Sequence, residues 1–127
     1  MNKTISRNKI IKAIKTEPLM SGDIVEMTFG YHVSTKRNSE VCALGAVLRK
    51  AGYSNRDIHT YGNRLSRRLE ILPILTEKNL RIVLKKKHYL VALSIKFEHL
   101  MSIYKLETAR KKLIGFVKYN FPIRIKL

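Results

Sequence analysis

Hydrophobic residues recur at helical spacing through most of this chain. In the segment Thr4–Lys15, Ile10, Ile11 and Ile14 form an apolar stripe, and the lysines between them face the other way. Pro18 ends this pattern, because the residue before a proline is pushed out of helical dihedral angles. The sequence therefore predicts an amphipathic first helix over Thr4–Lys15.

Two short stretches follow a period of two instead. Apolar side chains alternate with polar or small ones over Ile24–Val33, which is the pattern of a half-buried strand, and a polar, basic loop, Ser34–Ser39, follows it. Apolar residues also alternate with Arg and Lys over Ile123–Leu127, so we expect a short edge strand there. An edge strand is able to pair between two chains, so this pattern leaves the oligomeric state open.

Two helices are predicted in the middle of the chain. The first covers Glu40–Ala51, with Ser39 as its N-cap and Gly52 at its end. Its centre is apolar almost all round, which predicts a buried position at the centre of the core. A further helix begins at Ser54 or, because glycine disfavours a helix interior, after Gly62. Its apolar residues are spaced three, four and four apart: Ile58, Tyr61, Leu65 and Leu69.

Pro73 ends the preceding helical pattern. The segment Thr76–Tyr104 carries an apolar stripe at helical spacing and forms one long helix, or two with a break near Lys85–Lys87. Alternation around Leu80 leaves a short strand as an alternative. A last helix is predicted over Glu107–Tyr119. Together these patterns predict a single α+β domain spanning residues 1–127, mostly helical, with about four to six helices and a short minority sheet.

The charge of the chain is far from balanced. Its 127 residues include 26 Lys and Arg against 9 Asp and Glu, a formal net charge of +17. Positive side chains at this density repel one another, which destabilises the compact state. Solubility alone is a poor explanation for the excess, because added Asp and Glu increase solubility more than added Lys and Arg do. Residues 1–64 hold 11 basic and 5 acidic side chains, and residues 65–127 hold 15 and 4, so the second half supplies most of the excess. We expect an anionic partner.

The excess charge falls into three clusters, in residues 64–68, 85–87 and 110–118. Lysines and arginines of this kind contact phosphates largely without regard to sequence. Tyrosines beside basic side chains also suit single-stranded nucleic acid, whose bases stack on aromatic rings. We expect a partner that is RNA rather than DNA, or a nucleoprotein. The candidate nucleic-acid-binding residues are Arg56, Arg64, Arg67, Arg68, Lys85, Lys86, Lys87, Arg110, Lys111, Lys112, Lys118, Tyr53 and Tyr61.

An alternative function is suggested by the stretch Val47–Leu69, which resembles a helix-turn-helix. Ala51–Ser54 is similar to the tight turn of that motif, and Leu48 and Ile58 stand at the packing positions on either side. The arginines that follow would then meet base edges or phosphates of duplex DNA. The stretch departs from the motif at Leu48, where a small residue is usual, and at the glycine in mid-helix, Gly62. The alternative is a small DNA-binding transcriptional regulator.

Catalytic and metal-binding patterns are weak in this sequence. Asp23, Asp57 and the scattered glutamates show no spacing that suggests an acid–base pair. Cys42 with His32 or His59 forms a thiolate–imidazole pair only in principle, because a cysteine on an apolar helix behaves as a small hydrophobe. The histidines and Cys42 lack metal-ligand spacing, and the glycines form no phosphate-binding loop. We expect a non-enzymatic protein with no cofactor and no metal.

The sequence also predicts a soluble cytoplasmic protein. Cys42 is the single cysteine, so no internal disulfide forms and a reducing compartment is the simpler assumption. The N-terminal residues lack the continuous apolar stretch of a secretory signal, and no apolar run approaches the length of a membrane span. Lysines at helix ends leave peripheral binding to anionic lipid as a third possible function.

One short segment carries a resemblance to other proteins. Val41–Arg49 reads Val-Cys-Ala-Leu-Gly-Ala-Val-Leu-Arg and resembles the Cys-Ala-Leu-Gly-Ala helix of small proteins found in phages and bacteria. The short, highly basic chain is also similar in kind to inhibitors carried by phages and mobile elements, such as anti-CRISPR proteins. That resemblance implies an inhibitor that binds an RNA-guided nucleoprotein.

Overall fold

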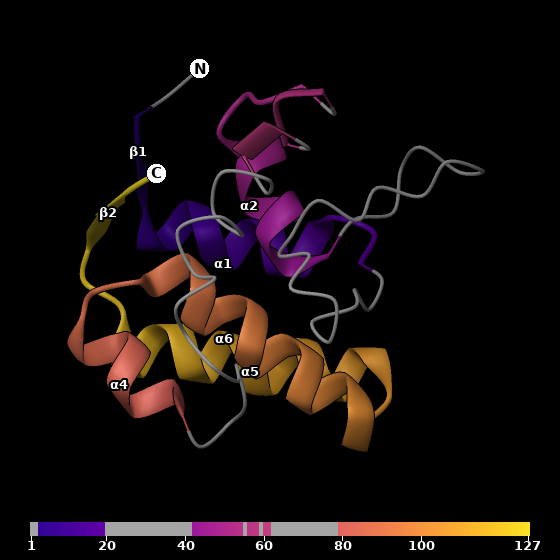
Figure 1. The fold of residues 1–127 in the computed structure, drawn as a ribbon. Coiled ribbons are helices and arrows are strands. Elements are labelled where there is room, and N and C mark those ends of the chain that lie inside the picture. Colours follow the sequence, from indigo (N-terminus) through magenta and orange to yellow (C-terminus); the bar gives the residue numbers. More distant parts are fainter. Residues whose placement is uncertain (1–2, 20–41, 55, 59, 62–78) are drawn as a thin grey trace.

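The computed structural model describes residues 3–19, 42–54, 56–58, 60–61 and 79–127. Most of these residues are helical, and six of them form a two-stranded sheet (Figure 1). This confirms the prediction of a mostly helical α+β fold. The predicted strand Ile24–Val33, the loop Ser34–Ser39 and residues 62–78 lie outside the described residues. The elements are β1 Thr4–Ser6, α1 Arg7–Thr16, α2 Ala43–Lys50, α4 Leu80–Lys85, α5 Tyr89–Ile103, α6 Leu106–Asn120 and β2 Arg124–Lys126.

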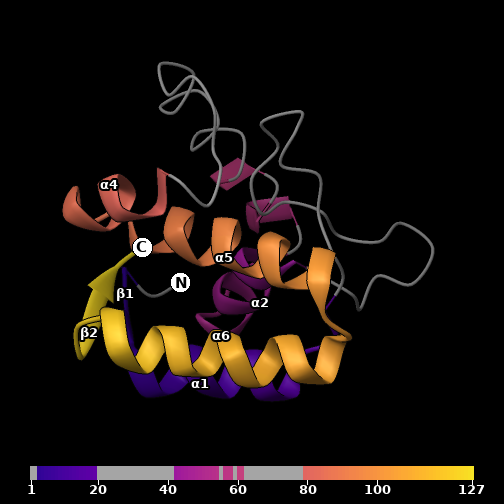
Figure 2. The same ribbon diagram turned by 90° about the horizontal axis from the view of Figure 1, so that it is seen from below.

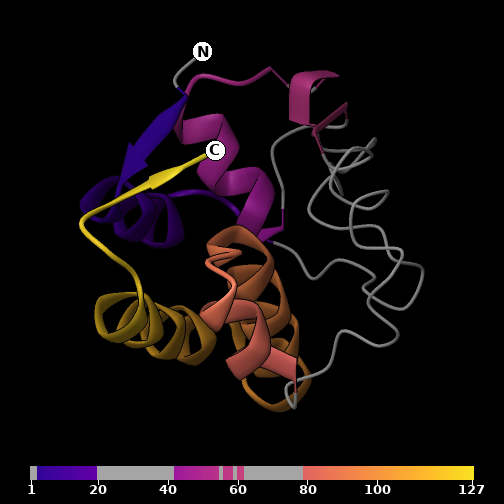
Figure 3. The ribbon, with the colours of Figure 1, turned by 60° about the vertical axis from the view of Figure 1, so that its left-hand side comes forward.

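Four helices form the body of the described fold. α1 contacts α2 and α6, and α5 contacts the same two helices, so the contacts close a ring. Two further views show α5 and α6 side by side, running in opposite directions, with α1 against α6 (Figure 2 and Figure 3). α4 packs on α5. Each helix of the ring contributes fully buried apolar side chains, among them Ile14, Leu44, Phe97 and Leu113.

The sheet pairs residues from the two ends of the described chain. β1 and β2 are antiparallel, and Ile5 faces Ile125 across the pair, with both side chains buried. The predicted C-terminal strand is thus confirmed. The predicted start of the first helix at Thr4 is wrong, because Thr4–Ser6 is a strand. Ser6 is the N-cap of α1, and its hydroxyl accepts a hydrogen bond from the backbone N–H of Lys9 at 3.2 Å.

α2 matches the prediction at its centre and at its end. Ala43–Leu48 are all buried, as the apolar run indicated. The N-cap is Cys42, whose Sγ accepts a hydrogen bond from the backbone N–H of Gly45 at 3.4 Å, whereas the predicted cap Ser39 lies outside the described residues. The helix ends at Lys50 with Ala51 as its C-cap, and Gly52 follows with a φ of 97°, in the left-handed region that glycine adopts easily.

The segment predicted as one helix or two forms two, α4 and α5, and the break lies at Lys85–Lys87. The N–H groups of Lys87 and His88 donate to carbonyls of the last turn of α4, which is the Schellman pattern of a helix end. Lys87 has a φ of 63°, so a lysine stands where this motif usually has glycine. The alternative of a short strand at Leu80 is wrong, because Leu80 begins α4.

Candidate nucleic-acid interface

Of the predicted basic clusters, the structure describes two, and these lie on different elements: one at the end of α4 and one on α6. Arg64, Arg67 and Arg68 fall outside the described residues. Arg56 is exposed on the short helical stretch after α2, and Lys85–Lys87 are exposed at the turn between α4 and α5. Of the described residues, Arg56 and Lys85–Lys87 do not line either of the two pockets described below. All of these predicted side chains stay candidate phosphate contacts.

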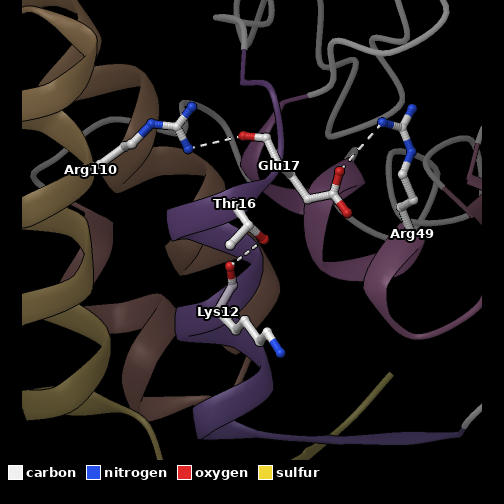
Figure 4. A network of polar contacts seen from close by, with 5 residues as sticks. All are labelled: Lys12, Thr16, Glu17, Arg49 and Arg110. Atoms are coloured by element: carbon white, nitrogen blue, oxygen red, sulfur yellow. Dashed lines mark hydrogen bonds and ion pairs between the residues drawn. The ribbon is translucent and has the colours of Figure 1, made fainter.

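Arg110 was predicted to bind nucleic acid, and the structure shows its guanidinium in contacts within the protein. Its side chain is only 13% exposed, and its Nη1 donates to the carbonyls of Ile14 and Glu17 at the end of α1. Figure 4 shows the contact with Glu17. The carbonyl of Ile14 lacks its helical partner because the residue four positions on, Pro18, has no N–H. The Nε of Arg110 lies 3.4 Å from Oε1 of Glu107, an ion pair without hydrogen-bond geometry. Arg110 therefore holds α6 to α1.

Tyr53 and Tyr61, the predicted stacking residues, contribute to packing. Both side chains are half-buried and lie against the hydrophobic core. Their rings meet edge to face, with centroids 6.1 Å apart and an interplanar angle of 86°. This edge-to-face pair stabilises the corner of the core that follows α2. Neither ring belongs to the pocket that the structure forms between α5 and α6.

The remaining predicted residues lie on α6. Lys111, Lys112 and Lys118 are exposed. Lys112 borders a pocket of about 420 Å³ between α5 and α6, which we call the α5–α6 pocket. The residues that line it are Lys96, His99, Leu100, Ile103, Tyr104, Lys112, Phe116, Tyr119 and Asn120. The structure thus brings one predicted lysine together with side chains that were not among the predicted site residues.

Cations and rings alternate along the α5–α6 pocket. The Lys112 ammonium lies 4.8 Å from the centroid of the Tyr104 ring, and the Lys96 ammonium lies 5.7 Å from that of Phe116. Such cation–π contacts hold the charge beside the rings and orient both groups. Tyr119 is 90% exposed, and Ile103 is 58% exposed. An apolar patch of this kind, rimmed by charge, is typical of an interaction surface.

Among the described residues, no carboxylate lines the α5–α6 pocket. Three of the acidic side chains in the described part of the chain have contacts elsewhere. Glu17 pairs with Arg49 at 3.7 Å, Glu107 lies beside Arg110, and Asp57 accepts hydrogen bonds from Ser54 (Figure 4 shows the first pair). The positive charge of the pocket is therefore not neutralised by its own lining.

The sequence does carry a signal for this pocket in its helical spacing. Lys96, His99 and Ile103 are three and four residues apart, and so repeat on one face of α5. Lys112, Phe116 and Tyr119 do the same on α6. Only two residues connect α5 and α6, so the two helices are antiparallel neighbours. Their polar–aromatic faces therefore line the same pocket. When each helix is considered separately, the same aromatic residues predict only side chains at the edge of the hydrophobic core, and not a pocket.

The structure also places part of the helix-turn-helix stretch and the single cysteine. Leu48 and Ile58, the packing positions of that stretch, are fully buried, while its predicted arginines 64, 67 and 68 lie outside the described residues. Cys42 is buried and serves as an N-cap. The described residues contain no group of histidines, cysteines and carboxylates arranged to hold a metal ion. Among the described helices, none is both long and apolar enough to cross a membrane.

Comparison with protein-family models, curated proteins and solved structures gives no match to this chain. The functional argument therefore rests on the α5–α6 pocket and on the charge around it.

Proposed function

We propose that this protein is a non-enzymatic binder of single-stranded RNA, and that the RNA bases enter the α5–α6 pocket. The observation that carries the proposal is the Tyr119 ring, which is 90% exposed in a pocket lined by Lys96, His99 and Lys112 and by no carboxylate. Single-stranded nucleic acids are held by this combination of stacking rings and positive charge.

The dimensions and chemistry of the pocket fit a nucleotide. A volume of about 420 Å³ lies within the usual range for small-ligand sites. Tyr119 offers a ring face for stacking, because its side chain is largely exposed, while Phe116 is half-buried and contacts Phe121 edge to face. Lys96 and Lys112 supply positive charge for the phosphates of a strand whose base stacks on Tyr119.

Single strands suit the pocket better than a duplex. Bases within a duplex are stacked on each other, so their faces are not accessible to Tyr119, whereas loops and single strands splay their bases. His99 and Asn120 add hydrogen-bonding groups to the lining. These groups favour RNA, because its 2′-hydroxyl is both a donor and an acceptor.

In a cell, the bound strand would be cytoplasmic RNA or the exposed RNA of an RNA-guided nucleoprotein. A phage-borne inhibitor of the anti-CRISPR type would act by occupying such a strand. This extension is supported by the net charge of +17 and by the resemblance of Val41–Arg49, and it depends on RNA binding.

The test compares Tyr119→Ala with Ile123→Ala, a matched truncation of an exposed apolar side chain outside the pocket. Fluorescence anisotropy with labelled single-stranded RNA, duplex RNA and duplex DNA at low salt measures the affinities. Stacking contributes about 1–3 kcal/mol per base, so Tyr119→Ala should weaken single-strand binding roughly 5- to 150-fold. Ile123→Ala should leave it within about twofold.

Two results would overturn the proposal. One is the absence of binding to single-stranded RNA at low salt. The other is an equal loss of affinity in Tyr119→Ala and Ile123→Ala. Tighter binding to one duplex DNA sequence than to any single strand would favour the DNA-binding regulator instead.

A further inference from the structure

A second basic pocket is formed by residues near both ends of the sequence, whereas residues 96–120 form the first. It has a volume of about 520 Å³ and lies between β1, the first turns of α1, and β2, and we call it the β1–α1 pocket. Its charged lining consists of Lys3, Lys9, Lys12 and Arg124, and none of them was among the predicted site residues. It shares no residue with the α5–α6 pocket.

The pairing of the two strands assembles these cations. Lys9 and Lys12 are three residues apart and therefore lie on one face of α1. Arg124 stands opposite Ser6 in the strand register, and its Nη1 donates to the hydroxyl of Thr4 at 3.0 Å. This hydrogen bond orients the guanidinium before any ligand arrives. All four cationic side chains are exposed and accessible to a ligand.

No acidic residue lies in β1, in β2 or in the first turn of α1. The nearest acidic side chain along the chain, that of Glu17, stands at the C-cap of α1 and pairs with Arg49 at 3.7 Å. Lys12 extends away from that ion pair (Figure 4). Four cations that repel one another in one hollow destabilise the folded state, and a bound anion relieves this repulsion.

The chemistry of the lining identifies the kind of anion. Of the residues that the structure describes, no aromatic one lines the β1–α1 pocket, so these residues offer no ring for a base to stack on. The helix end adds little, because the N–H of Arg7 donates to the carbonyl of Ile123 at 2.7 Å and that of Lys9 donates to Ser6. Recognition must therefore rest on the cations, assisted by Thr4 and Asn8.

We propose that the β1–α1 pocket binds an oligophosphate, a chain of two or three linked phosphates. A single phosphate would leave some of the four cations without a partner, whereas a triphosphate carries enough charge and oxygen atoms for all of them. Arg124 matches phosphate oxygens with two parallel donors, and the lysines act as point charges. The oligophosphate is either free or the 5′-triphosphate end of an RNA. This inference goes beyond RNA binding in the α5–α6 pocket and does not rest on it.

The test titrates inorganic tripolyphosphate into the full chain by calorimetry, in buffer without divalent cations and at fixed ionic strength. The double variant Lys9→Gln/Lys12→Gln should weaken binding at least tenfold. Lys15→Gln is the matched control, because Lys15 is exposed on the same helix but does not line the pocket, and it should change the affinity less than threefold. Tyr119→Ala should bind tripolyphosphate as the parent does, which separates this test from that of RNA binding.

A second arm identifies the source of the oligophosphate. The same short RNA is compared with a 5′-triphosphate and with a 5′-hydroxyl. A preference for the triphosphate that is lost in Lys9→Gln/Lys12→Gln supports an RNA end, and tripolyphosphate binding without this preference supports a free oligophosphate. The inference is overturned if tripolyphosphate binds no more tightly than sulfate, or if Lys15→Gln weakens binding as much as the double variant.

Discussion

The two faces of α6 both carry positive side chains, but these side chains lie in different surroundings. On the face toward α1, Arg110 is 13% exposed and donates to carbonyls at the end of that helix. On the face that borders α5, Lys112 is exposed beside the Tyr104 ring. At the opposite end of the same helix pair, Arg7 of α1 donates to the carbonyl of Phe121, the C-cap of α6, at 3.1 Å.

α1 and α6 thus cap each other with one arginine each. The last carbonyls of a helix lack partners within the helix and carry the negative end of its dipole, so a cation there is favourable. A count of Lys and Arg does not separate such structural cations from those available to a ligand. The comparison between Arg110 and Lys112 makes this separation measurable.

The largest expected effect is on stability, in Arg110→Gln. Hydrogen bonds from a charged group contribute about 1.5–3 kcal/mol each, so losing two of them should lower the free energy of unfolding by about 3–6 kcal/mol. Urea denaturation measures this, with Lys111→Gln as the exposed neighbour, expected to change within about 0.5 kcal/mol. Affinity for single-stranded RNA, measured where both variants are folded, should stay within about threefold of the parent. A stable Arg110→Gln protein that no longer binds RNA would reverse the assignment.

A smaller effect of opposite sign is expected at Lys87, a surface cation whose backbone is unfavourable. Its φ of 63° disfavours any residue with a Cβ, so Lys87→Gly should raise the free energy of unfolding by about 0.5–1 kcal/mol. Lys87→Ala removes the same charge and keeps the Cβ, and so it should give no increase. Equal gains in the two variants would show that relief of charge repulsion, and not backbone geometry, is the cause.

The smallest effect distinguishes two neighbouring lysines of α6. Lys112 lines the α5–α6 pocket and Lys111 does not, although both are exposed. Losing the cation–π contact and one phosphate contact, worth together about 0.5–1 kcal/mol, should make Lys112→Gln bind single-stranded RNA about threefold more weakly. The slope of log affinity against log salt should also become shallower by about 0.7. Identical titration curves for Lys111→Gln and Lys112→Gln would mean that charge acts diffusely and that the pocket has no special role.

Local patterns predicted much of the fold. The apolar stripes and their stop signals located α2, α5 and α6, and the run Lys85–Lys87 marked the break between α4 and α5. The misplaced start of the first helix has a non-local cause, since Thr4–Ser6 becomes a strand only by pairing with residues 124–126. The cap of α2 was missed because cysteine is not a usual N-cap, and its sulfur is a weak acceptor.

The candidate site was harder to predict, because the number of charged residues does not tell which of them face the core and which line a pocket. Helical periodicity nevertheless separates two of the cations. Arg110 lies three residues before Leu113 and seven before Val117, on the buried stripe of α6, whereas Lys112 lies two residues further on, nearly opposite. The β1–α1 pocket had no such signal, because Lys9 and Arg124 meet only through the long-range pairing of the strands.

That pairing has a consequence for the order of folding. The hydrogen bond between Arg124 and Thr4 spans 120 positions of the sequence, so forming it closes a loop that includes nearly the whole described chain. Closure over such a length is entropically costly until the helices between have condensed, which makes this sheet a late event. The β1–α1 pocket therefore exists only in the completed fold. A ligand bound there selects the native state by mass action and reports on the last step of folding.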